Sequence, residues 1–133
     1  MLAAVLAGFL VGAGIAFVLH TVSGVALSWL LVGTGVRTED LYSAMAELPV
    51  INAWAHLVNV AAMLCAGAGA AFLRPSSPIL AALLVGAVML GFVILQFITP
   101  YEHQAPLWSK ALHLVIPIPA AVVGAWLWRV RAA

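Results

Sequence analysis

The chain has 133 residues, of which 66% are hydrophobic and 7% are charged, and its mean hydropathy is +1.21. A soluble domain is about half apolar and a quarter charged, so these few charges cannot solvate a globular surface. The net charge of +1 and the scattered Lys and Arg residues give no basic stripe, which argues against a nucleic-acid partner. The composition therefore predicts one integral membrane domain over residues 1–133, with lipid as its surroundings.

The first apolar run, residues 2–32, is longer than the roughly 20 residues that cross a bilayer as a helix. It predicts a tilted or overlong helix that is retained rather than cleaved as a signal peptide. Residues 38–49 follow and predict a short amphipathic helix on the membrane surface, because Leu41, Met45 and Leu48 share one face. A solvated loop is the alternative for this segment.

Three further apolar runs, at about residues 50–73, 79–98 and 107–130, predict the remaining spans. Pro117 and Pro119 predict a kink in the fourth span, because proline lacks the N–H that a helix needs. The predicted fold class is therefore all-α, an up-down-up-down four-helix bundle in the membrane with a short amphipathic helix between spans one and two.

The distribution of basic residues predicts the orientation in the membrane. Arg74, Arg129 and Arg131 share one side of the predicted bundle, whereas Arg37 and Lys110 lie on the other. The positive-inside rule counts three against two and favours cytoplasmic N- and C-termini. We expect the protein in the cell (inner) membrane.

Small residues recur every four positions in the first span, at Ala4, Gly8, Gly12 and Ala16. Such spacing lets helix backbones approach closely in lipid. It predicts packing either within this bundle or against other membrane subunits or a second copy of the chain. Cys65 is the single cysteine and is interpreted as a buried thiol without a function.

Two histidines stand out, because polar side chains inside a membrane are costly unless they are paired or used. His56 in span two and His113 in span four each lie about six residues into their helix, roughly 9 Å deep. Spans two and four of such a bundle are diagonal neighbours, roughly 14 Å apart. That gap suits a haem b with one imidazole on each face of the iron. His56 and His113 are the candidate metal ligands, and hydrogen bonds across a helix seam are the alternative.

Other residues complete the candidate site. Asn59 and Gln96 could accept hydrogen bonds from ligating imidazoles, and Lys110 could contact haem propionates. His20, deep in the first span, is interpreted as a hydrogen bond across a seam or as part of a proton path. His103 is interpreted as a solvated loop residue.

Three short stretches carry a resemblance. Ala55–His56 in span two, Ile94–Leu95–Gln96 in span three and residues 111–117 in span four resemble small four-span bacterial membrane proteins of unknown function. Those proteins are similar in turn to four-helix b-type cytochromes. The resemblance covers roughly spans two to four, and it implies one haem rather than two, because spans two and four carry one histidine each.

The sequence leaves three functions open. The first is a small membrane haem protein that passes electrons near the outer face. The second is a cofactor-free accessory or assembly subunit of a larger membrane complex, packed through its Gly/Ala helix faces. The third is a quinone or proton site built from the same polar residues. The sequence contains no zinc spacing, no paired intramembrane carboxylates and no phosphate-binding loop, so we do not expect independent catalysis.

Overall fold

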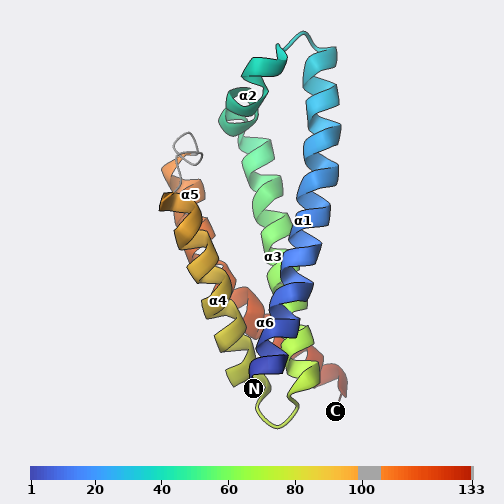
Figure 1. The fold of residues 1–133 in the computed structure, drawn as a ribbon, viewed down its shortest axis with the longest axis vertical. Coiled ribbons are helices and arrows are strands. Elements are labelled where there is room, and N and C mark those ends of the chain that lie inside the picture. Colours follow the sequence, from blue (N-terminus) through green and yellow to red (C-terminus); the bar gives the residue numbers. More distant parts are fainter. Residues whose placement is uncertain (99–105, 133) are drawn as a thin grey trace.

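A computed structural model describes residues 1–98 and 106–132, and for residues 42, 46, 96, 98 and 132 it describes the backbone only. The elements in chain order are α1 (Leu2–Gly33), a 3-10 helix η1 (Thr38–Asp40), α2 (Leu41–Glu47), α3 (Pro49–Leu73), α4 (Pro78–Ile98), α5 (Leu107–Val115) and α6 (Pro117–Ala132). The described part of the chain contains helices and no strand, which confirms the all-α prediction there (Figure 1).

Three helices, α1, α3 and α4, are long and apolar enough to cross a membrane. A fourth candidate span consists of α5 and α6 together, which are bent by 42° at the break between them. The break falls at Ile116, directly before Pro117. Because Pro117 has no N–H and its ring crowds the preceding turn, a straight helix cannot run through this point. The predicted kink is confirmed.

The connection between α1 and α3 is helical, as predicted for residues 38–49. The chain leaves α1 through Gly35, whose φ of +94° is a left-handed value that glycine adopts without steric cost. Arg37 and Glu39 then form an exposed ion pair. Pro49 is the first residue of α3, where its missing N–H has no helical partner to lose.

The termini and the connections lie at the two ends of the molecule (Figure 1). The N-terminus, the turn between α3 and α4 and the C-terminus lie at one end, and α2 and α5 lie at the other. All five tryptophans are exposed, and they lie toward these two ends: Trp29, Trp54 and Trp108 toward that of α2 and α5, Trp126 and Trp128 toward that of the termini. This placement is typical of the aromatic belts at two membrane interfaces.

Helices α3 and α6 are in direct backbone contact, which differs from the expected arrangement. A Cβ atom at Gly67 of α3 would collide with the backbone of Ala121, and one at Gly124 of α6 would collide with the backbone of Leu64. Spans two and four are therefore neighbours, and the prediction that they lie diagonally is wrong. Glycine at both contacts is the reason, because it removes the side chains that would hold the helices apart.

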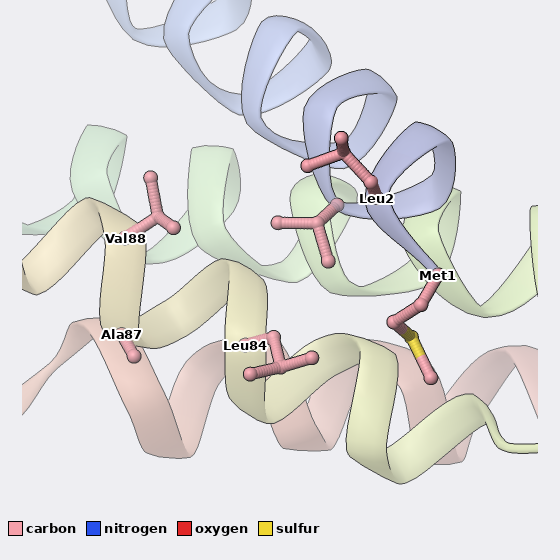
Figure 2. Close-up of a pocket in the computed structure, with 6 residues that line it drawn as sticks. Met1, Leu2, Leu84, Ala87 and Val88 are labelled. Carbon is pink, nitrogen blue, oxygen red and sulfur yellow. The ribbon is translucent and has the colours of Figure 1, made fainter.

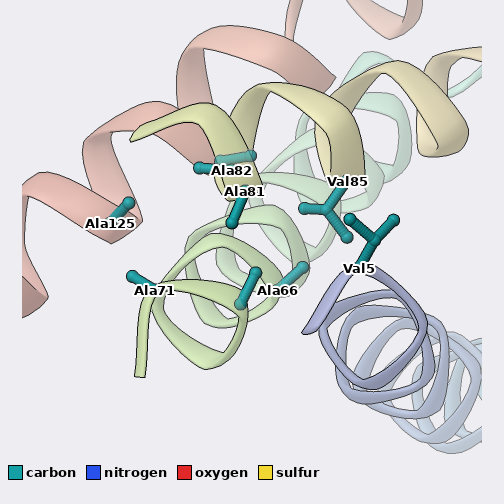
Figure 3. Packing of buried hydrophobic residues seen from close by; sticks show 9 residues of the cluster. Val5, Ala66, Ala71, Ala81, Ala82, Val85 and Ala125 are labelled. Atoms are coloured by element: carbon teal, nitrogen blue, oxygen red, sulfur yellow. The ribbon is translucent and has the colours of Figure 1, made fainter. Parts of the chain in front are cut away.

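Alanine and valine residues make up one buried cluster of the core (Figure 3). Helices α1, α3, α4 and α6 contribute the labelled residues Val5, Ala66, Ala71, Ala81, Ala82, Val85 and Ala125. The glycine stripe of α1 belongs to this packing, since a Cβ at Gly8 would lie 2.7 Å from the Ala66 carbonyl oxygen. Cys65 does not belong to this packing, because its side chain is exposed. The buried face of α3 runs through the neighbouring residues Ala66 and Gly67 instead, so the expectation of a buried thiol is wrong.

Candidate functional site

The described part of the chain holds an open apolar groove of about 530 Å³ between the start of α1 and α4 (Figure 2). Its lining residues are Met1, Leu2, Val5, Leu84, Ala87 and Val88. Not one of these side chains is polar, so the groove offers hydrocarbon contacts and nothing that would orient a ligand. In a bilayer, the acyl chain of a lipid suits such a surface. The buried polar side chains lie elsewhere, between α3 and α5.

Polar chemistry gathers around Ser109, near the start of α5. The Ser109 hydroxyl lies 2.9 Å from Nε2 of His56 and donates a hydrogen bond to Oδ1 of Asn52 at 3.3 Å. The Ser109 carbonyl oxygen lies 3.2 Å from Nδ1 of His113. These four residues, Asn52, His56, Ser109 and His113, together form the Ser109 cluster.

Helical spacing explains how four residues meet. Asn52 and His56 are four residues apart on α3, and Ser109 and His113 are four apart on α5, so each pair occupies one helix face. The two faces meet across the seam between α3 and α5. Ser109 is fully buried and His56 is only 6% exposed, so the polar atoms of both are withdrawn from lipid.

The hydrogen bonds determine where the protons lie. A serine hydroxyl has one hydrogen, and that of Ser109 points to Asn52 Oδ1, so the hydroxyl accepts from Nε2–H of His56. Nδ1 of His56 then carries a lone pair, and this buried atom has no hydrogen-bond partner among the described residues. A carbonyl only accepts, so His113 donates from Nδ1–H. In its neutral form, the His56 ring therefore presents Nδ1 as a buried acceptor atom.

Ring contacts join α3 and α5 at the cluster. The ring centres of His56 and His113 lie 4.5 Å apart at an interplanar angle of 54°. The indole of Trp108 lies 5.7 Å from the His56 ring. The two imidazoles are therefore in contact, and the Trp108 ring lies beside that of His56.

This geometry does not fit a haem held between His56 and His113. Metal–imidazole bonds are about 2 Å long, so two axial imidazoles need ring centres about 6 Å apart, with the porphyrin between them. The observed 4.5 Å leaves no space for that plane, and Nε2 of His56 is engaged by Ser109. Within residues 1–98 and 106–132, no group of three or more His, Cys, Asp or Glu residues could hold a metal ion.

Asn59 takes part in a second, deeper contact. Its Oδ1 accepts a hydrogen bond from Nε2 of His20 at 3.1 Å, which joins α1 to α3. The interpretation of His20 as a hydrogen bond across a helix seam is confirmed. Asn59 binds His20 rather than His56 or His113, in contrast to the expected support of an axial ligand.

The other candidates are placed as follows. Lys110 is half-buried and follows Ser109 directly on α5. Gln96 belongs to α4, but its side chain lies outside the described part, as does the whole of His103. Ser109 was missed by sequence reasoning, although its four-residue spacing from His113 was a usable signal.

Comparisons with known proteins do not place the chain: no family model, no curated protein and no solved structure matches it.

Proposed function

We propose that the chain is a cofactor-free accessory subunit of a larger membrane complex and that the Ser109 cluster is its proton-binding centre. The observation that carries the proposal is the hydrogen-bonded chain from Asn52 through Ser109 to His56, which ends on His56 Nδ1, a buried atom without a hydrogen-bond partner in the part of the chain that the structure describes. Polar side chains between membrane helices are costly, so a cluster of four is a functional site by default.

Histidine is the side chain whose charge normally changes between about pH 5 and 8. Nδ1 of His56 has no partner among residues 1–98 and 106–132, and the hydrogen bond from Nε2 to Ser109 can persist when Nδ1 takes up a proton. His113 lies in ring contact at 4.5 Å. Two positive charges at that separation would repel strongly in an apolar environment, so the pair is suited to hold one proton rather than two.

The proposed topology is an up-down-up-down bundle whose fourth span is the bent pair α5 and α6, with both termini cytoplasmic. Arg74, Arg129 and Arg131 lie in or beside the elements at the end that holds the termini, which supports this orientation. The Ser109 cluster then lies in the outer half of the membrane, because α5 begins at the opposite end.

An accessory role is favoured by the small polar surface. The described connections are short, namely residues 34–40, residue 48 and residues 74–77, which favours recognition of a partner through lipid-facing helices. Haem binding and electron transfer stay a prediction. They would require the His56–Ser109 hydrogen bond to break and the two imidazoles to separate.

The test is a ¹⁵N NMR titration of the histidine-labelled chain in lipid nanodiscs, with each signal assigned by a His→Gln variant. At high pH we expect His56 to be protonated at Nε2 and His113 at Nδ1. On acidification to about pH 5, the pair should gain one proton, and Ser109→Ala should change that titration. If both rings keep their neutral spectra over this range while the backbone spectrum shows a folded chain, the proposal of a proton-binding centre is wrong.

A further inference from the structure

The side-chain amide of Asn52 is fixed by a backbone carbonyl where α2 meets α3. Nδ2 of Asn52 donates a hydrogen bond to the carbonyl oxygen of Leu48 at 3.2 Å. Leu48 lies between the two helices, and its carbonyl oxygen also accepts from the backbone N–H groups of Ile51 and Asn52. The first turn of α3 therefore holds this oxygen in place, and the amide is anchored to the main chain.

The Leu48 carbonyl determines which way the amide faces. A carbonyl oxygen only accepts hydrogen bonds, so it must face the NH2 group of the amide. If the amide were turned over, Oδ1 of Asn52 would face the Leu48 oxygen, and two acceptors would meet without a hydrogen between them. Oδ1 is therefore the atom that Asn52 presents to the Ser109 hydroxyl, at 3.3 Å.

The direction of the hydrogen bonds is passed from Asn52 to His56 through Ser109. Oδ1 of Asn52 carries no hydrogen, so the Ser109 hydroxyl donates to it and acts as an acceptor toward His56. Nε2 of neutral His56, 2.9 Å from that hydroxyl, then carries the ring hydrogen. Nδ1 keeps its lone pair, and it is the buried atom without a hydrogen-bond partner among the described residues.

The opposite tautomer of His56 would not suit proton binding. If the Ser109 hydroxyl donated to Nε2, the hydrogen of the ring would lie on Nδ1. The lone pair of the ring would then be engaged by the hydroxyl, and a proton could bind only after that hydrogen bond was broken. The tautomer of His56 therefore decides whether the ring presents an acceptor atom to an incoming proton.

We infer that Asn52 is the positioning residue of the proton-binding centre: its amide, oriented by the Leu48 carbonyl, sets the tautomer of His56 and keeps Nδ1 as the proton-accepting atom. The inference rests on the proposed proton-binding function and adds the residue that selects the accepting atom. Asn52 exerts this effect through the Ser109 hydroxyl, which bonds to both side chains.

The chain offers a matched control for Asn52 on the same helix. Asn59 lies seven residues further along α3, on a similar face. Its Oδ1 lies 3.1 Å from Nε2 of His20, so its described hydrogen bond lies outside the Ser109 cluster. Asn59→Leu removes the same chemical group from α3 as Asn52→Leu and leaves the acceptor of the Ser109 hydroxyl in place.

The test is a ¹⁵N NMR spectrum of the histidine-labelled chain in nanodiscs at about pH 8, where neutral rings report their tautomers. The parent should show the His56 hydrogen on Nε2. In Asn52→Leu, Nε2 of His56 is the remaining described partner of the Ser109 hydroxyl, so the Nδ1–H form should rise several-fold. Asn52→Asp should restore the Nε2–H form, because both carboxylate oxygens accept and no orientation by Leu48 is needed.

A His56 signal in Asn52→Leu that matches the parent overturns the inference. An equal change in Asn59→Leu also overturns it, since the effect would then be a general disturbance of α3. A change in Asn52→Asp as large as in Asn52→Leu overturns the role of the acceptor. If Asn52→Leu does not fold, Asn52→Val should give the same shift and decides the question.

The proposed function is tested separately, by acidification of the parent. The tautomer spectra are recorded on neutral rings and do not depend on proton uptake. If the tautomer follows Asn52 but the acidified parent gains no proton, the proton-binding function is wrong and the control of the His56 hydrogen by Asn52 stands.

Discussion

Replacement of Ser109 by alanine is expected to lower the free energy of unfolding by about 2–3 kcal/mol. The hydroxyl makes two hydrogen bonds, to His56 and Asn52, in a fully buried position. Hydrogen bonds between membrane helices contribute about 0.6 kcal/mol on average and up to about 1.7. Leaving a buried donor without an acceptor costs a further 1–3 kcal/mol, roughly, and Nε2–H of His56 would be such a donor.

The assay is reversible unfolding of the purified chain in mixed micelles, followed by circular dichroism. Ser28→Ala is the matched control, because the described bond of the Ser28 hydroxyl goes to the Gly24 carbonyl of its own helix, at 2.8 Å. We expect that control to lie within about 0.5 kcal/mol of the parent. The double variant His56→Leu/Ser109→Ala should lose less than the sum of the single variants, since it leaves no unpaired imidazole donor. A loss in Ser109→Ala no larger than in Ser28→Ala would refute the assignment of Ser109 as the hub.

Three further outcomes are expected. Gly67→Ala should lower the free energy of unfolding by about 1–3 kcal/mol, because its Cβ meets the backbone of Ala121, whereas Gly14→Ala, with nothing within 4 Å, should not; equal effects in the same unfolding assay would contradict the backbone contact. Cys65 should react with a lipid-soluble maleimide in membranes without denaturant, since the thiol is exposed; labelling only after unfolding would contradict its outward placement. The chain purified from haem-replete cells should show no Soret band, because the His56 and His113 rings touch; a Soret band lost in His56→Ala would revive the haem prediction.

Hydropathy and proline positions were sufficient to predict the helices. The run of residues 2–32 became α1 (Leu2–Gly33), and Pro117 marked the break in the fourth span. These features follow from local physics: an apolar run must satisfy its own backbone hydrogen bonds in lipid, and proline cannot continue a helix. Local rules of this kind act on the sequence directly, before any tertiary contact is known.

The relative placement of the helices could not be predicted in the same way. Depth along a helix can be counted from the sequence, and it correctly put His56 and His113 at a similar level. The distance between them depends on which helices are neighbours, and the glycines at positions 67 and 124 brought α3 and α6 together. The expected diagonal separation, and with it the space for a haem, rested on the topology of an idealised bundle.

The break at Pro117 connects the helix positions, which could be predicted, with the helix packing, which could not. C-terminal to Ile116 the backbones of α3 and α6 touch at Gly67 and Gly124, so no side chain can enter the seam at these contacts. On the other side of the break, α5 is bent by 42° relative to α6. This bend leaves room between α5 and α3 for side chains as large as His56, His113 and Trp108. A straight fourth helix that continued the glycine contact would exclude these rings from the seam. The kink therefore accounts for the position of the polar cluster at one end of the bundle.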